Sequence, residues 1–255
     1  MEIHSQQLTT LHARAHRSFV DELVDHVTTY FPAHAALGEP QIRRVIDHAV
    51  ARAQLHGFTS ERNICLYLDL VLMLGADLDV DPQIPWAAEI LADPGFTHPT
   101  LRIDHLTNTA LTHLERTAGV DDVHLERAVD RLRRDMDDMI HMVDRSGSMW
   151  PPLALRILRR IWPERCDELG EVPLAYLIRG AYEGAHHHGL AARHDLAIYL
   201  VCTFLFGSGF AHDPQYPWAA AALAAESGDG ARKAERLYQG GLAWLVHMFA
   251  RTEVA

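Results

Sequence analysis

The sequence predicts an all-α protein made of two copies of a roughly five-helix unit, joined by an amphipathic helix. Residues 37–92 and 169–224 align without a gap at a constant offset of 132, and 20 of the 56 aligned positions are identical. Apolar residues recur three and four positions apart along most of the chain, which is the spacing of one helix face. No stretch alternates with period two for long enough to predict a strand.

The first copy belongs to a unit that we expect to span residues 1–118. Apolar residues spaced three and four apart mark one helical face in residues 8–31, and Pro32 ends that helix. The next helix follows Pro40 and stops at Gly57, since glycine readily adopts the left-handed conformation that often ends a helix.

The third helix of this unit should be its centre. Residues 61–74 are apolar almost all round, so neighbouring helices must cover every side of this segment. Pro85 and Trp86 then open a short fourth helix, because proline is favoured in the first helical turn. A fifth helix is expected over residues 99–118.

The second unit, residues 151–255, repeats this plan, and residues 119–150 connect the two units. Within 121–145, apolar residues alternate four and three positions apart. This pattern predicts a helix that packs along another helix, either as a bridge inside the chain or as the contact of a homodimer. Residues 146–148, Ser-Gly-Ser, precede two prolines and predict a linker there.

Composition and charge narrow the classes of function. The formal net charge of −11 disfavours binding to the phosphate backbone of a nucleic acid. The apolar runs at 64–74 and 196–206 are too short for a membrane span, which needs roughly 20 residues. Residues 1–19 lack the basic start and the apolar run of a signal peptide. We therefore expect a cytoplasmic protein without nucleic-acid or membrane partners.

Aromatic residues that recur in both copies are expected to build the scaffold. Tyr67 matches Tyr199, and Trp86 matches Trp218. Such pairs favour packing inside a helical core over ligand binding, because the polar tips of these side chains can be satisfied within the core.

Acidic residues precede the tryptophan helix of each copy. Asp81 and Asp213 are each followed by proline, and we expect each carboxylate to form a turn by accepting backbone N–H groups. Asp77, Asp79 and Asp81 also have the every-second-residue spacing of a calcium loop, but the glycine and glutamate that such a loop needs are missing. Asp77 and Asp79 are retained as candidate binding residues.

Asp69 is unusual because it lies inside the apolar third helix, where an unpaired carboxylate would be costly. Arg43, Arg44 or Arg62 could neutralise it. The second copy has Val201 at the matching position, so the scaffold does not require this charge. Asp69 is therefore either an ion pair specific to the first unit or part of a pocket, and Asp69 and Arg62 join the candidate binding residues.

Two carboxylate–histidine steps offer an alternative site. Glu183 with His186, and Asp138 with His141, have the spacing that holds a carboxylate-bridged di-metal centre in helical bundles. The first copy has neither glutamate nor histidine at the positions matching the first pair, so the pattern is not part of the repeated unit. We predict no metal ion and no other cofactor, with this set as the alternative.

Motifs of the common enzyme classes are missing. The Gly-Ser-Gly at residues 207–209 is too short for a nucleophile elbow and follows a helix instead of a strand. The chain has no glycine-rich phosphate loop and no His-Glu-x-x-His motif. The sequence therefore favours a protein that is not an enzyme.

A family resemblance is carried by the string Glu-Arg-Asn-Ile-Cys-Leu-Tyr-Leu-Asp-Leu at residues 61–70, followed by Gly75, Asp77, Asp79, Asp81-Pro82 and Pro85-Trp86-Ala87. This string resembles a group of bacterial helical proteins encoded beside the toxins of type VI and related contractile injection systems. The resemblance covers mainly residues 1–115. It implies an accessory protein that binds a secreted effector, as an adaptor or as an immunity protein, and it brings no catalytic residues.

We therefore expect a non-enzymatic protein-binding accessory factor whose partner is another protein, such as a secreted effector or a secretion component. Two alternatives stay open. One is a metal-dependent helical enzyme or metal sensor. The other is a small-molecule or pH sensor, because the 18 histidines would gain positive charge between pH 7 and pH 5.

Overall fold

The computed structural model describes residues 5–145, 149–224 and 230–249. Within these ranges the chain is helical, as the sequence predicts, and contains no strand. The first unit contains α1 (Ser5–Tyr30), the short 3₁₀ helix η1 (Pro32–Leu37), α2 (Glu39–Leu55), α3 (Glu61–Leu74), α4 (Pro85–Ala92) and α5 (Pro99–Thr117).

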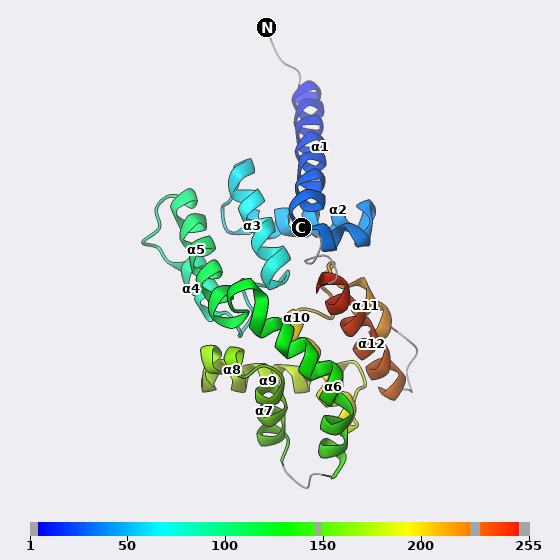
Figure 1. Cartoon of the computed structure of the whole chain (residues 1–255). Coiled ribbons are helices and arrows are strands. Elements are labelled where there is room, and N and C mark those ends of the chain that lie inside the picture. Colours follow the sequence, from blue (N-terminus) through cyan, green and yellow to red (C-terminus); the bar gives the residue numbers. More distant parts are fainter. Residues whose placement is uncertain (1–4, 146–148, 225–229, 250–255) are drawn as a thin grey trace.

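A 3₁₀ turn, η2 (Val120–Asp122), leads from the first unit into the connecting helix α6 (Val123–Arg145). The second unit contains α7 (Trp150–Ile161), α8 (Pro163–Leu169), α9 (Glu171–His187), α10 (Arg193–Phe206), α11 (Pro217–Leu223) and α12 (Gly230–Phe249). Figure 1 shows α1 projecting away from the other helices and α6 crossing the middle of the molecule. None of the described helices combines the length and the apolar character that a bilayer crossing needs.

Helix boundaries recur at the offset found in the sequence. Both ends of α2 shifted by 132 residues give the ends of α9, and both ends of α3 give those of α10. Gly57 and Gly189 follow α2 and α9 with φ of 77° and 76°, the left-handed conformation predicted for Gly57. The same glycine signal therefore ends α2 and α9.

Each unit has its own hydrophobic core. The buried residues of the first core run from Val20 to Ala110, and those of the second from Ala128 to Leu245. Tyr67 and Tyr199 are buried in these cores, as the sequence predicts, and α3 and α10 supply the central residues of each. The scaffold is therefore two packed helical layers built around matching central helices.

The connecting helix belongs to the second core. Its apolar stripe, Val129, Leu132, Met136 and Met139, is buried, and α6 contacts α7, α10 and α12. The apolar face that was predicted to form a bridge or a homodimer contact is thus buried within the chain. A homodimer through α6 would have to use another face of this helix.

The two units meet through a pair of equivalent loops, residues 75–84 after α3 and 207–216 after α10, which we call the paired loops. Asp81 accepts the backbone N–H of Gln83 (2.8 Å) and reaches across to that of Ser208 (2.7 Å). The Asp213 carboxylate likewise accepts the backbone N–H of Gln215 (2.8 Å) in its own loop and that of Ala76 (2.8 Å) in the opposite loop. The predicted turn-forming role of both aspartates is confirmed, and each also binds the opposite unit.

The glutamines of the paired loops repeat this exchange. The Gln83 amide donates to the carbonyl oxygen of Thr203, and the Gln215 amide donates to that of Val71, both at 2.9 Å. The two donor residues are 132 positions apart, and so are the two acceptor residues. The two units are therefore joined by reciprocal hydrogen bonds that follow a pseudo-twofold arrangement.

Glycine opens both paired loops because the backbones approach closely there. Gly75 and Gly207 have φ of 103° and 94°, which other residues rarely adopt. A Cβ on Gly207 would lie 3.1 Å from the Asp81 carboxylate, and one on Gly75 would lie 3.3 Å from the carbonyl oxygen of Phe206. A side chain at either position would push the units apart.

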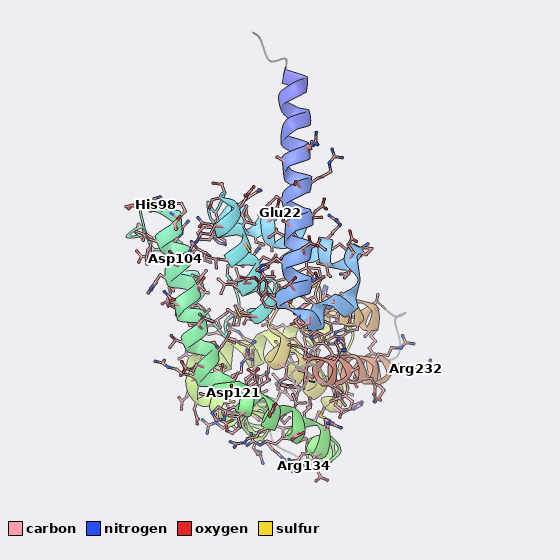
Figure 2. All side chains as sticks on the ribbon, turned by 45° about the horizontal axis from the view of Figure 1, so that its top comes forward. Glu22, His98, Asp104, Asp121, Arg134 and Arg232 are labelled. Carbon is pink, nitrogen blue, oxygen red and sulfur yellow. The ribbon has the colours of Figure 1, made fainter. Side chains whose placement is uncertain are left out.

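Replacing Asp81 or Asp213 by alanine should destabilise the protein by about 2–4 kcal/mol, because each change leaves two backbone N–H groups without an acceptor at a buried joint. Urea unfolding at pH 7 measures this loss. Asp104→Ala is the control, since Asp104 pairs with Arg62 on the outer surface of α5 (Figure 2) and should cost less than about 1 kcal/mol. Equal losses of unfolding free energy in Asp81→Ala and Asp104→Ala would contradict the stabilising role of Asp81 at the joint.

Candidate protein-binding groove

A groove of about 820 Å³ lies between α7 and α9. Most of its lining is apolar: Trp150, Pro151, Pro152, Leu155, Leu174, Ala175, Ile178 and Tyr182. The charged residues along it are Arg159, Glu171 and Arg179. Its surface is therefore mainly hydrophobic, with charges of both signs.

Local sequence explains why the groove stays open. The face of α7 that contains Leu153 and Ile157 is buried in the second core, which leaves Trp150 and Leu155 on the side toward the groove. Pro151 and Pro152 occupy the first helical turn, where their missing N–H groups cost nothing. The helix therefore starts with an apolar side that the described elements cover only in part.

Large apolar side chains are exposed along the groove and beside it. Met149 and Val172 are 76% and 65% exposed, and Tyr176 and Tyr182 are 52% and 40% exposed. The Trp150 ring lies 6.4 Å from that of Tyr182, and its indole Nε1 is buried without a hydrogen-bond partner. A contiguous apolar surface of this kind marks an interaction site more often than a free surface.

The first unit provides an internal comparison for this surface. Ala175 matches Arg43, which pairs with Asp21 at 2.6 Å and with Glu39 at 2.8 Å. Tyr176 likewise matches Arg44, an arginine. The same face of the scaffold is thus charged in the first unit and apolar in the second. The fold does not require exposed apolar residues here.

The acidic residues singled out in the sequence hold the paired loops in place. The Asp77 carboxylate accepts from Nε2–H of His212 at 2.8 Å, across the joint between the units. Asp79 accepts from Nε2–H of His56 at 2.7 Å and from the guanidinium of Arg52. Burial alone would raise the pKa of Asp79, but these hydrogen bonds hold it below its usual value.

Asp69 pairs with a histidine, and none of the three predicted arginines neutralises it. Its carboxylate lies 2.7 Å from His26 Nε2 on α1, while Arg62 pairs with Asp104 on α5. Burial raises the pKa of Asp69 above its usual value. The sequence missed this partner because it does not show which side of α3 faces α1.

Asp69 also belongs to the one group of described residues whose ligand atoms could share a metal ion. The atoms of His26, Cys65 and Asp69 lie within 4.8 Å of one another. Burial, followed by the nearby Asp69 charge, raises the pKa of the Cys65 thiol to about 11, so the thiol is protonated at neutral pH.

The alternative metal residues do not form such a group in the described residues. Glu183 and His186 are exposed on α9, and the His186 Nδ1–H donates to the Tyr182 carbonyl oxygen at 2.8 Å. Asp138 is exposed on α6, and the side chain of His141 lies outside the described residues.

The matched tryptophans pack as the sequence suggests. The Trp86 ring lies 5.6 Å from that of His113, and the Trp218 ring lies 5.2 Å from that of Phe206. Neither tryptophan lines the groove. Some groove residues on α9 differ between the copies, such as Ala175 opposite Arg43, whereas Glu171 and Ile178 match Glu39 and Ile46. The loss of an arginine at Ala175 is the signal in the sequence that points to the groove.

Comparison with known proteins adds no further assignment. No protein-family model, no curated protein and no solved structure matches the chain.

The Asp77–His212 pair should make stability depend on pH in a defined window. Their hydrogen bond raises the pKa of His212 above 6.5 and lowers the pKa of Asp77 below 3.8. The stability gained from protonated His212 is fully present below pH 6.5 and is lost as the pH rises through the raised pKa of this histidine. The aspartate contribution is present above pH 3.8 and lost as the pH falls through its lowered pKa. The pair is therefore strongest between these two values.

His212→Gln should consequently cost more stability at pH 5.5 than at pH 8.5. The difference should stay below about 1 kcal/mol, because the His212 side chain is 69% exposed and solvent screens the pair. Urea unfolding at the two pH values measures it. His187→Gln, which changes an exposed imidazole on α9, is the control and should show no such dependence. A larger loss at pH 8.5 would contradict the assignment.

Proposed function

We propose that this chain is a non-enzymatic accessory factor that binds another protein through the groove between α7 and α9. The observation that carries the proposal is the mainly apolar lining of this groove, in which the exposed Ala175 stands where the first unit has Arg43. The resemblance of residues 61–87 to proteins encoded beside contractile injection toxins supports a secreted effector as the partner. An adaptor or an immunity protein would carry out this role in the cytoplasm.

The occupant that fits the groove is an amphipathic helix of the partner. Two neighbouring helices with apolar side chains between them form the kind of groove that takes the apolar face of a third helix. Arg159 and Arg179 line the groove with Glu171 as its one acidic residue. The local charge is thus positive on a chain with net charge −11, which favours acidic residues beside the apolar face of the bound helix.

Ala175→Arg should abolish binding while leaving the fold intact. The new guanidinium would lie in the apolar lining and lower the affinity at least about 100-fold, as expected for a change at the centre of an interface. The matching position of the first unit already carries Arg43, so the unfolding free energy should change by less than about 1 kcal/mol. Co-expression with each neighbouring gene product, followed by size-exclusion chromatography, measures complex formation.

Leu111→Arg is the matched control, because Leu111 is 52% exposed on α5, away from the groove. This variant should form the complex as the wild type does. Three outcomes would overturn the proposal: no complex with any neighbouring product, a complex that survives Ala175→Arg, or a wild-type dimer that Ala175→Arg converts to a monomer. The last would show that a second copy of the chain occupies the groove.

A further inference from the structure

A second cavity, of about 520 Å³, lies at the joint between the two units. Its walls come from η1 and η2, the paired loops, the ends of α3, α5 and α10, the start of α6, and the helices α8 and α12. Aromatic side chains form much of it, among them Phe31, Trp162, Phe206 and Trp244. This cavity is separate from the α7–α9 groove, and the two share no lining residue.

Arg165 on α8 places a guanidinium in the wall of this cavity. Its Cζ lies 4.9 Å from the centre of the Trp162 ring and 5.3 Å from that of Phe204. No hydrogen bond or ion pair to this side chain is formed by the residues that the structure describes, and the buried Nε has no acceptor. An arginine has five N–H donors, so this group is held in place by aromatic faces while its donors stay unused.

The main charge that compensates Arg165 among the described residues is already engaged elsewhere. Burial lowers the pKa of Arg165, and the Asp81 carboxylate is the main charge that opposes the shift. Asp81, however, is already bonded to the backbone N–H groups of Gln83 and Ser208. Arg165 is partly buried and its guanidinium lines the cavity, so an anion from outside the chain can reach the N–H groups that have no partner among the described residues.

A comparison of the two halves of the pseudo-twofold arrangement reveals a hydrogen bond that is present in one half and missing in the other. In one half, His34 Nε2–H donates to the Gln215 Oε1 at 3.0 Å. Aligning Phe31-Pro32 with Trp162-Pro163 places Arg165 at the position of His34 in the other half. There the equivalent glutamine, Gln83, is 2% exposed and its Oε1 has no partner. Gln83 and Arg165 both line the cavity.

Two further polar atoms complete the cavity wall. His34 Nδ1 is buried without a partner and, because Nε2 carries the proton given to Gln215, it is an acceptor. Burial, helped by the nearby Arg165 charge, lowers the pKa of His113 to about 4, so this imidazole is neutral at pH 7. Asp122 also lines the cavity, and burial raises the pKa of its carboxyl. The cavity therefore offers a cation and two buried unpaired acceptors within aromatic walls.

We propose that this cavity binds a small organic acid, whose carboxylate pairs with Arg165 and whose apolar body lies against the aromatic walls. Arginine binds carboxylates through two parallel N–H···O bonds, which suits a guanidinium fixed between rings. Gln83 Oε1 and His34 Nδ1 accept hydrogen bonds from N–H or O–H groups of the same ligand. An aromatic acid with one N–H donor supplies the carboxylate, the apolar body and a hydrogen bond to one of these two acceptors.

Matched pairs of probes test the proposal on the full chain. The acids are indole-3-acetate, phenylacetate and octanoate, and the controls are the corresponding alcohols, which keep the apolar body and lose the charge. Isothermal titration calorimetry, together with the fluorescence of Trp162 and Trp244 in the cavity wall, measures binding. We expect at least one acid to bind about 10- to 100-fold more tightly than its alcohol, the range of a charge-assisted hydrogen bond.

Arg165→Met keeps the length of the side chain and removes its charge. This variant should lose that 10- to 100-fold preference for the acid and keep the affinity for the alcohol. Without ligand it should be at least as resistant to urea as the wild type, because it removes an unpaired buried charge. Arg116→Met is the control, since Arg116 is an exposed partner of Glu168 and lies outside the cavity.

The proposal fails if none of the acids binds at millimolar concentration, or if Arg165→Met binds the acid as the wild type does. It also fails if Arg165→Met weakens acid and alcohol equally or unfolds at lower urea than the wild type, since either result assigns the guanidinium to the fold. Ala175→Arg, which changes only the groove, should bind the acid normally, so failure of the proposed protein-binding function is distinguishable from failure of this site.

Discussion

The structure depends on one reciprocal interaction: each unit supplies an aspartate that caps the backbone of the other. Asp81 and Asp213 both close a turn in their own loop and accept an N–H across the joint. Burial raises the pKa of both carboxyls, and the backbone N–H groups oppose that shift by favouring the charged form. A contact that serves both the turn and the interface cannot be removed from one unit without disturbing the other.

This constraint explains which positions are matched between the copies. The Asp-Pro-Gln string and the two glycines must be present twice, because the joint uses each of them from both sides. Positions that do not take part in the joint or in the cores can diverge. The groove contains such a position, Ala175, which replaces an arginine. The cavity lies at the joint itself, where Arg165 replaces the His34 that satisfies the opposite glutamine.

Much of the fold could be predicted from the sequence because the relevant signals are local. Apolar spacing, Pro85 and Gly57 set helix ends through backbone geometry, and the structure places these helices close to the expected bounds. The turn role of Asp81 and Asp213 followed from the same local chemistry. The reciprocal contact did not follow, because an internal repeat identifies equivalent residues without showing that they touch.

The candidate sites were harder to predict because they depend on distant residues. Asp77 and Asp79 looked like binding residues, but they pair with His212, His56 and Arg52, which lie 23 to 135 positions away. The groove is visible in the sequence only as a loss of charge on α9 relative to α2. The Arg165 cavity requires helices and loops of both units to meet, and no single stretch of sequence carries that information.

The positions of the two sites also determine how they can influence each other. The cavity touches both units at their joint, so a ligand bound there stabilises the assembled pair of units by mass action. The groove lies entirely within the second unit, between α7 and α9. An acid in the cavity can change the affinity of the groove only if it interacts differently with two arrangements of α7 and α9. Since α8 and α10 both pack against α7 and α9 and also line the cavity, they are the helices through which such coupling would pass.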